Sequence, residues 1–414
     1  QSFTIFESRH FIFAGDGSLV ELPLPQKSGV SGVANDLLIA SLNEDWDYQG
    51  TVYPAGSVVS LDPGSLVAAP VFVPADRQAV DGVSIGKDTI YVELLDNIKG
   101  RILKLTSADG GWKTETVDLP GNGVVNIASV DSASGDLLAY FESPLSPDTL
   151  YHVAGNSLVP AAVKSTPAFF DSEGMVSLQF EATSSDGTKI PYFVTAKQSV
   201  LDAGPAPTVQ YGYGGFQVTT SPTYSGVTGK LWLERGGVYV IANIRGGGEF
   251  GPAWHQAALK ENRQLAFDDF YAVSEDLIAR GITTPEQLGI YGGSNGGLLM
   301  GVAMTQRPEL YRGIAIAVPL LDMLRYNTLL AGASWMGEYG NPDIAEERAW
   351  IEKYSPYQNI DPAADYPEAF IFTSTKDDRV HPGHARKFAA RLEEYGKPFL
   401  YFENTEGGHA ASAN

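Results

Sequence analysis

A serine bracketed by glycines is the residue of this sequence best suited to do chemistry. Residues 292–296, Gly-Gly-Ser-Asn-Gly, fit the pattern Gly-x-Ser-x-Gly, in which a strand turns sharply into a helix and exposes the hydroxyl of Ser294. Such a turn needs close backbone approaches that larger side chains would obstruct. The helix that follows directs unpaired N–H groups and its positive dipole end toward a developing oxyanion. The pattern predicts a nucleophilic serine, and a glycine-rich β–α turn without a catalytic role is its alternative.

A base and an acid must accompany the serine, because a base removes the hydroxyl proton and a carboxylate orients that base. Hydrolases with this turn place the acid, and then the histidine, after the serine in the chain. Of the histidines that follow, His381 and His384 adjoin a predicted helix, whereas His409 lies in a glycine-flanked loop after the last predicted strand. His409 is therefore the preferred base. Asp377, which follows another predicted strand, is the expected acid.

The second part of the sequence alternates buried strands with helices. Strands are predicted at residues 209–213, 238–244, 288–291, 314–318, 369–373 and 398–402, and helices at 267–280, 382–395 and from Ser294 to about 306. This alternation indicates an α/β fold with a doubly wound parallel sheet. Reactive groups of such sheets lie at the carboxyl ends of the strands, where Ser294 and Asp377 are expected.

The first part contains short strand-like runs separated by turn residues. The runs are residues 3–6, 10–13, 37–40, 57–61, 89–94, 102–105 and 137–141. This texture is typical of an all-β sandwich, a barrel or propeller blades, and the period alone does not choose among them. With blades of about 40–50 residues, the segment would hold about three, too few to close a ring. We expect an all-β domain at 1–168 and an α/β domain at 169–414.

Composition excludes several classes of function. The 43% of hydrophobic and 19% of charged residues describe a soluble globular protein, and no apolar run is long enough to span a bilayer. The net charge of −21 argues against nucleic acid and anionic membranes as partners. The sequence has no cysteine, which excludes disulfides and thiolate metal sites. No cluster has metal-ligand spacing, so no metal is expected.

A glycine run at residues 246–251 fits Gly-x-Gly-x-x-Gly directly after a predicted strand. A dinucleotide site would also need an acidic residue about 20 positions further on, at the end of the next strand. Asp268 and Asp269 open a predicted helix instead. We interpret the run as a tight loop beside the active site and expect no cofactor.

Several runs together resemble the peptidase domain of the prolyl oligopeptidase family. They are Tyr-Gly-Tyr-Gly-Gly-Phe at 211–216, Ala-Asn-Ile-Arg-Gly-Gly-Gly-Glu at 242–249, Gly-Gly-Ser-Asn-Gly-Gly-Leu-Leu at 292–299, Tyr-Ser-Pro at 354–356, Asp-Asp-Arg-Val at 377–380 and Gly-His at 408–409. The resemblance covers the second part of the chain. Over the first part it is weak, but the family would place a β-propeller there.

The resemblance implies a role for each matching residue. Ser294 is expected to be the nucleophile, His409 the base and Asp377 the acid; Asp377 is preferred to Asp378 because the acid of the family stands two places before the arginine. The backbone N–H of Asn295 and the hydroxyl of Tyr213 are expected to form the oxyanion hole. The remaining implied residues bind substrate: Arg379 a substrate carbonyl, and Phe216, Trp335, Tyr339, Val380 and Leu320 the proline ring.

Elementary chemistry agrees with a pocket for proline. Proline is a compact apolar ring without an N–H, so the flat indole of Trp335 can select it by stacking and desolvation. The alternative for Trp335 is a side chain that fills a core. The expected function is a serine endopeptidase that cleaves oligopeptides after proline. The alternatives are an acyl-peptide hydrolase, a basic-residue oligopeptidase, an esterase, or a catalytically silent fragment that serves as an interaction module.

Members of the resembled family are longer than this sequence. They carry a peptidase segment before a complete seven-bladed propeller, and a helix after the histidine loop. The chain is therefore expected to be the C-terminal portion of such a protein, completed by a preceding segment or by a second chain. Cytoplasmic and periplasmic locations are both open.

Overall fold

The computed structural model describes residues 1, 5–13, 15–86, 88–108 and 110–410. The chain forms two compact units. The first consists of Gln1–Ala168, Ser221–Ser225 and Gly248–Trp254, and the second of Phe169–Thr220, Gly226–Gly247 and His255–Asn414. The sequence-based boundary after residue 168 assigns the two short segments of the first unit to the second domain.

The first unit is built from β-strands. They are β1 (Phe11–Phe13), β2 (Leu19–Glu21), β3 (Ser28–Ala34), β4 (Leu37–Leu42), β5 (Trp46–Tyr48), β6 (Thr51–Tyr53), β7 (Val58–Leu61), β8 (Ala68–Phe72), β9 (Gln78–Ile85), β10 (Thr89–Asp96), β11 (Lys99–Ala108), β12 (Gly111–Thr116), β13 (Val124–Val130), β14 (Leu137–Ser143), β15 (Ser146–Val153) and β16 (Ala161–Ser165).

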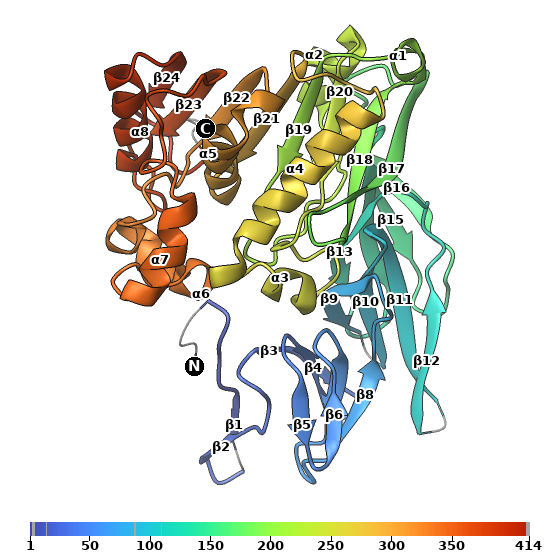
Figure 1. Ribbon diagram of the computed structural model, residues 1–414. Helices are drawn as coiled ribbons and strands as arrows, with labels where there is room; N and C mark the ends of the chain where they lie inside the picture. The colour runs from blue at the N-terminus through green and yellow to red at the C-terminus, as the bar shows by residue number, and fades with distance from the viewer. Residues whose placement is uncertain (2–4, 14, 87, 109, 411–414) are drawn as a thin grey trace. The chain divides into compact units, whose positions relative to one another are not determined.

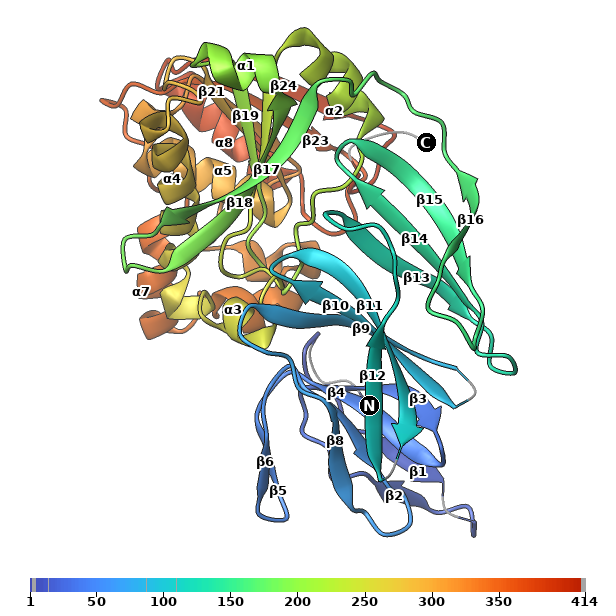
Figure 2. The same ribbon diagram turned by 90° about the vertical axis from the view of Figure 1, so that its right-hand side faces the viewer.

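Three four-stranded antiparallel sheets dominate this unit, in the orders β3-β4-β7-β8, β12-β11-β10-β9 and β13-β14-β15-β16 (Figure 2). Tight hairpins connect neighbouring strands. Asn35 and Asn97 each begin a two-residue loop in which both residues have positive φ, the geometry that matches the twist of paired strands. Successive sheets share apolar cores: one contains Ile39 of β4 and Ile90 of β10, and another contains Ile102 of β11 and Leu137 of β14.

The predicted all-β region is confirmed. Six of the seven expected runs fall in strands, namely in β1, β4, β7, β10, β11 and β14. The remaining run, at 3–6, lies partly outside the described residues. Four-stranded antiparallel sheets packed face to face have the form of propeller blades, and their number agrees with the estimate of about three.

The second unit alternates strands and helices. Its strands are β17 (Met175–Thr183), β18 (Lys189–Lys197), β19 (Thr208–Gly212), β20 (Val238–Ala242), β21 (Leu288–Gly293), β22 (Gly313–Ala317), β23 (Glu368–Ser374) and β24 (Phe399–Asn404). Its helices are α1 (Gln198–Ala203), α2 (Gly226–Leu231), α4 (Gln264–Ala279), α5 (Asn295–Gln306), α6 (Met336–Tyr339), α7 (Ala345–Tyr354) and α8 (Gly383–Glu394). The short helix α3 (Pro252–Gln256) begins in the segment assigned to the first unit and ends in the second. Short 3-10 turns lie at Leu233–Arg235, Lys260–Asn262, Pro308–Leu310, Tyr326–Thr328 and Leu330–Trp335.

One eight-stranded sheet runs through this unit in the order β17-β18-β20-β19-β21-β22-β23-β24 (Figure 1). From β20 to β24 the neighbouring strands are parallel, and each of these six strands was expected from the sequence. The α/β prediction is confirmed. The sheet is nevertheless mixed, because β17 and β18 pair antiparallel and β18 also runs antiparallel to β20.

Helices pack against the sheet, and the candidate site residues follow the strand ends at one of its edges. The helix α4 packs on β17 and β18, α5 on β21 and β22, and α8 on β23 and β24. Five neighbouring strands, β19, β21, β22, β23 and β24, end at one edge, and the segment after each of them carries a candidate site residue. This shared edge explains how residues far apart in the chain come together. Within the described part of the chain, none of the helices has the length and apolarity needed to cross a membrane.

Candidate active site

The serine turn is strained at the serine itself. Ser294 joins β21 to α5 with φ 59° and ψ −116°, a conformation that non-glycine residues seldom adopt. Its backbone N–H donates to the carbonyl of Ala317, at the end of the neighbouring strand β22, at 2.9 Å. Ser294 is therefore anchored by its backbone, while its side chain remains partly accessible.

The flanking glycines are required by close packing. A Cβ at Gly292 would lie 2.5 Å from the carbonyl oxygen of Gly296, and a Cβ at Gly296 would lie 2.7 Å from the carbonyl oxygen of Gly212. A Cβ at Gly297 would lie 2.6 Å from the carbonyl oxygen of Ala317. Backbone atoms cannot retreat as the end of a flexible side chain can, so only glycine lets α5 approach β19 and β22 this closely.

Asp377 and His409 form a hydrogen-bonded pair. The Nδ1 atom of His409 lies 2.7 Å from Oδ2 and 2.9 Å from Oδ1 of Asp377. Oδ1 also accepts from the backbone N–H groups of Arg379 and Val380, each at 2.9 Å. Burial alone raises the pKa of Asp377, but the hydrogen bonds from His409, Arg379 and Val380 outweigh it and leave the pKa below the ordinary value.

The ionised state of Asp377 sets the tautomer of His409. A carboxylate only accepts hydrogen bonds, so Nδ1 of His409 donates and Nε2 keeps its lone pair. A neutral imidazole in this tautomer can receive a proton at Nε2. The pair has the chemistry of a base held by an orienting acid.

The two histidines set aside in the sequence analysis have structural partners. His384 is buried, and its Nδ1 accepts from the backbone N–H groups of Leu321 and Asp322 at 3.2 and 3.0 Å. Burial lowers the pKa of His384 to about 4, so the ring stays neutral. In His381, Nδ1 accepts from the backbone N–H of Gly383 at 2.9 Å. The Nδ1 of His381 thus binds the backbone at the start of α8, and the Nδ1 of His384 binds the backbone of the segment after β22.

A cavity of about 250 Å³ brings the candidate residues together. Its lining comprises Tyr213, Phe216, Val218, Ser294, Leu320, Trp335, Arg379 and His409. Nucleophile and base candidates thus face the same small space. The walls are aromatic and aliphatic, and among the described residues the only charged side chain in the lining is the cation Arg379.

Tyr213 is placed to act as a hydrogen-bond donor. Tyr213 and Ser294 line the same cavity. Burial raises the pKa of Tyr213 above its ordinary value, which keeps the phenol protonated. Asn295 is the first residue of α5, and N–H groups of a first helical turn have no partner within the helix. The expected oxyanion donors therefore flank Ser294.

Two of the expected pocket residues lie behind the wall. Tyr339 is fully buried; its ring meets that of Phe216 edge-on at 5.6 Å, and its hydroxyl donates to Oδ1 of Asn295 at 2.7 Å. Val380 is also buried, beside Arg379. Neither side chain belongs to the lining, so in this structure both support the residues that do.

Four residues near the cavity were not anticipated from the sequence. Val218 lines it, and Arg263, His255 and Glu338 form a buried ionic cluster behind it. A valine two places after Phe216 carries no catalytic signal by type. The cluster joins residues separated by 75 and 83 positions, which no local pattern reveals.

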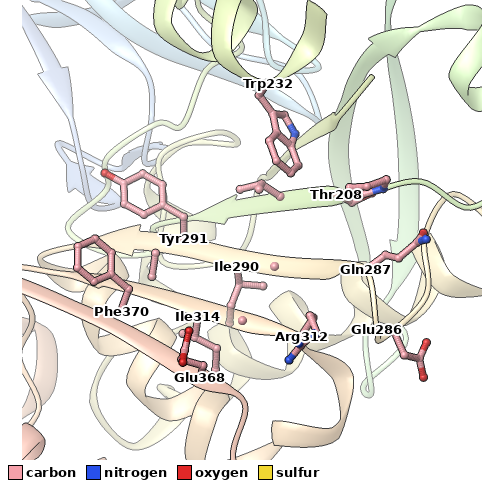
Figure 3. Close-up of a pocket in the computed structure, with 15 residues that line it drawn as sticks. Thr208, Trp232, Glu286, Gln287, Ile290, Tyr291, Arg312, Ile314, Glu368 and Phe370 are labelled. Carbon is pink, nitrogen blue, oxygen red and sulfur yellow. The ribbon is translucent and has the colours of Figure 1, made fainter. Parts of the chain in front are cut away.

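A larger hollow lies elsewhere on the sheet. Its volume is about 540 Å³, and Trp232, Ile290, Tyr291 and Phe370 contribute to its lining (Figure 3). Size alone would favour this groove as the site. It contains none of the residues expected to do chemistry, and we therefore assign the chemistry to the smaller cavity.

The first residue of the glycine run lies beside the site. Gly246 has φ 92°, and a Cβ there would lie 2.5 Å from the carbonyl oxygen of Gly214 in the loop that carries Tyr213 and Phe216. Its carbonyl accepts from the backbone N–H of Gln217 at 3.1 Å. Over the described range, no group of three or more His, Cys, Asp or Glu residues is arranged to hold a metal ion.

Comparison with known proteins identifies related sequences. The profile of the prolyl oligopeptidase family matches residues 222–414. An uncharacterized peptidase of Sinorhizobium fredii is 47% identical over 407 residues, which are 96% of this chain and 56% of that protein. The prolyl endopeptidase of Elizabethkingia meningoseptica is 38% identical over 308 residues, 73% of this chain and 43% of that protein.

A solved structure is similar over nearly the whole chain. It is that of a post-proline cleaving enzyme from Rickettsia typhi, with a TM-score of 0.92 and 36% identity over 98% of this chain and 60% of that one. The chain spans about half the length of the curated relatives it matches.

Proposed function

This chain belongs to the prolyl oligopeptidase family of serine peptidases, and from that premise we propose that it hydrolyses oligopeptides on the carboxyl side of proline. Ser294 is the nucleophile, His409 the base and Asp377 the orienting acid. The observation that carries the proposal is the pair Asp377–His409 at 2.7 Å, opening on a small aromatic cavity that also holds Ser294.

The reaction begins with proton transfer. Nε2 of His409 takes the proton of the Ser294 hydroxyl while the oxygen attacks the carbonyl carbon of the substrate proline. The carbonyl oxygen becomes an oxyanion, which accepts hydrogen bonds from the Asn295 backbone N–H and the Tyr213 phenol. The raised pKa of Tyr213 supports this role, because only the protonated phenol donates.

Collapse of the intermediate completes the first half of the reaction. The bond from carbon to nitrogen breaks, and His409 gives its proton to the leaving amine. A water molecule then loses a proton to His409 and attacks the ester on Ser294. The ester bond breaks, His409 returns the proton to the Ser294 oxygen, and the acid is released. Asp377 stays ionised throughout and stabilises the imidazolium, in agreement with its lowered pKa.

The cavity supports proline as the residue before the cut. Phe216, Leu320 and Trp335 offer apolar surfaces for a compact ring. Arg379 reaches the same space and supplies a cation for a substrate carbonyl oxygen. The rival specificity for basic residues would require a carboxylate in the lining, and the lining residues in the described part of the chain include no Asp or Glu. Asp377 and Glu338 are engaged in hydrogen bonds outside that lining.

Substrates that differ only in the residue before the cut test this proposal. The chain should cleave a Gly-Pro chromogenic peptide with a kcat/KM far above those of the Gly-Arg and Gly-Ala analogues. Ser294→Ala should lower kcat by several orders of magnitude and leave the affinity for the peptide nearly unchanged. Equal cleavage by Ser294→Ala and parent would overturn the nucleophile, and a preference for Gly-Arg would overturn the specificity alone.

A further inference from the structure

A buried ionic network lies behind the cavity and takes no part in the steps above. Its centre is the fully buried Glu338 of α6. Oε1 of Glu338 accepts from Nη1 of Arg263 at 2.9 Å and from the backbone N–H of Phe216 at 3.0 Å. Oε2 lies 2.8 Å from Nε2 of His255. Because a carboxylate only accepts, the imidazole of His255 donates from Nε2.

Arg263 connects this centre to the neighbour of the nucleophile. Its Nη2 donates to Oδ1 of Asn295 and to the carbonyl of Gly214, each at 2.7 Å. Oδ1 of Asn295 also accepts from the Tyr339 hydroxyl at 2.7 Å. The amide Nδ2 of Asn295 in turn donates to the carbonyl of Tyr213. The side chain of Asn295 is thus fixed from three directions.

The contribution of such a network to fold stability does not by itself explain its presence. Charges that are buried as a pair contribute little net stability, since apolar residues of similar volume often do as well, whereas removal of one partner is costly. Here Glu338 accepts from the backbone N–H of Phe216, and Arg263 donates to the backbone carbonyl of Gly214. Both backbone groups belong to the loop whose residues Tyr213 and Phe216 line the cavity together with Ser294. We therefore interpret the network as one that positions this loop.

We propose that Glu338 is a positioning residue. By holding Arg263, His255 and the Phe216 N–H, it fixes Asn295 and the 213–216 loop so that the oxyanion donors and the pocket wall keep their places around Ser294. The proposal deepens the proposed function and rests on it for the catalytic consequence. Its structural part, the anchoring of the loop by Glu338, stands independently.

Hydrogen–deuterium exchange combined with kinetics on the full chain tests both parts. Glu338→Gln keeps the shape but removes the charge that Arg263 needs; Glu338→Asp keeps the charge but withdraws it by one methylene. The matched control is Glu346→Gln, an exposed carboxylate on α7. Both Glu338 variants should exchange faster at 213–217 than the parent and the control. Per folded molecule, kcat should fall by about ten- to a hundredfold, with a smaller change in KM.

Each outcome separates the two proposals. Unchanged exchange at 213–217 in a folded Glu338 variant overturns the anchoring. Faster exchange with an unchanged kcat per folded molecule overturns the positioning role, and so does a loss of activity that only follows the unfolded fraction. If the parent reacts with a fluorophosphonate but does not cleave after proline, the proposed specificity fails, and the rate of that labelling replaces kcat as the measure of Glu338.

Discussion

At the scale of single residues, the proposed role of Asp377 as the acid can be tested against a neighbouring carboxylate. Asp377 and Asp378 are adjacent carboxylates, but only Asp377 is buried and bonded to His409. An amide at 377 can donate to Nδ1, which would hold the imidazole in the tautomer that cannot accept a proton at Nε2.

Asp377→Asn should therefore lower kcat by about 10⁴-fold, as replacement of the acid does in such triads. Asp378→Asn removes the same charge from an exposed position and should leave kcat near that of the parent. Steady-state kinetics on the two variants decide the matter. A larger loss in Asp378→Asn would assign the acid to the wrong aspartate.

Trp335 is the residue on which the proposed preference for proline most depends. Its indole lines the cavity and is partly exposed. Trp335→Ala should raise KM for a post-proline peptide, because an apolar contact with the substrate is removed. The fall in kcat/KM should correspond to about 1–3 kcal/mol of transition-state binding free energy. The rate of fluorophosphonate labelling should stay near the parental value. Loss of labelling together with peptide cleavage would show that Trp335 supports the catalytic groups instead.

Much of the candidate site could be proposed from residue types, because motifs preserve what chemistry needs. Ser294 was indicated by its glycines, and His409 by its loop and its place after the acid. The network of Glu338, Arg263 and His255 was beyond reach, since its hydrogen bonds join residues 75 and 83 positions apart. Nothing local to Glu338 distinguishes it from a carboxylate on a solvated helix.

At the scale of elements, the turn between β21 and α5 depends on backbone contact. Gly296→Ala would place a Cβ 2.7 Å from the Gly212 carbonyl oxygen, so α5 must move. We expect a loss of about 1–3 kcal/mol in stability and loss of fluorophosphonate labelling. Gly289→Ala in β21 is the control, since its Cβ would meet no atom closer than 3.6 Å. If Gly296→Ala is as stable and reactive as this control, the packing argument fails.

The contact between two sheets of the first unit carries a pH dependence. Glu93 of β10 accepts from the backbone N–H of Ile127 in β13 at 3.1 Å. Burial raises the pKa of Glu93 from 4.5 to about 7. Between these values the folded state binds a proton that the unfolded chain has lost, so stability falls as pH rises through this window.

Glu93→Gln should remove that slope, because a neutral amide still accepts the hydrogen bond. The variant should match the parent near pH 4.5 and exceed its Tm by at least about 2 °C above pH 7. Calorimetry across this pH range measures the difference. A variant with the same pH profile as the parent would exclude Glu93 as the source.

Strand prediction succeeded where strands are buried and parallel and failed at one edge of the sheet. The strands β19 to β24 read as apolar runs, whereas no strand was expected between residues 169 and 208. There β17 mixes exposed and buried positions irregularly, and β18 contains Pro191, a residue that argues against a strand. Pairing with neighbours, invisible in the local sequence, makes both of them strands.

At the scale of the whole molecule, the net charge of −21 affects the rate at which charged peptides associate with the chain. Its field attracts cations and repels anions over a Debye length, which shrinks from about 30 Å at 0.01 M salt to about 3 Å at 1 M. Post-proline peptides with distant lysines should therefore have a higher kcat/KM at low salt than the same peptides with glutamates. The difference should vanish at high salt. A preference that survives high salt would point to a specific contact.

The central claim is that Ser294 attacks the carbonyl carbon of the substrate proline and carries the acyl group that ends in that proline. Mass spectrometry of the chain, quenched during turnover of an ester whose acyl part ends in proline, tests this directly. The account predicts an added mass equal to that acyl group on the peptide containing Ser294, and its disappearance in His409→Gln. Turnover with the acyl group on another residue, or with none on Ser294, would contradict it.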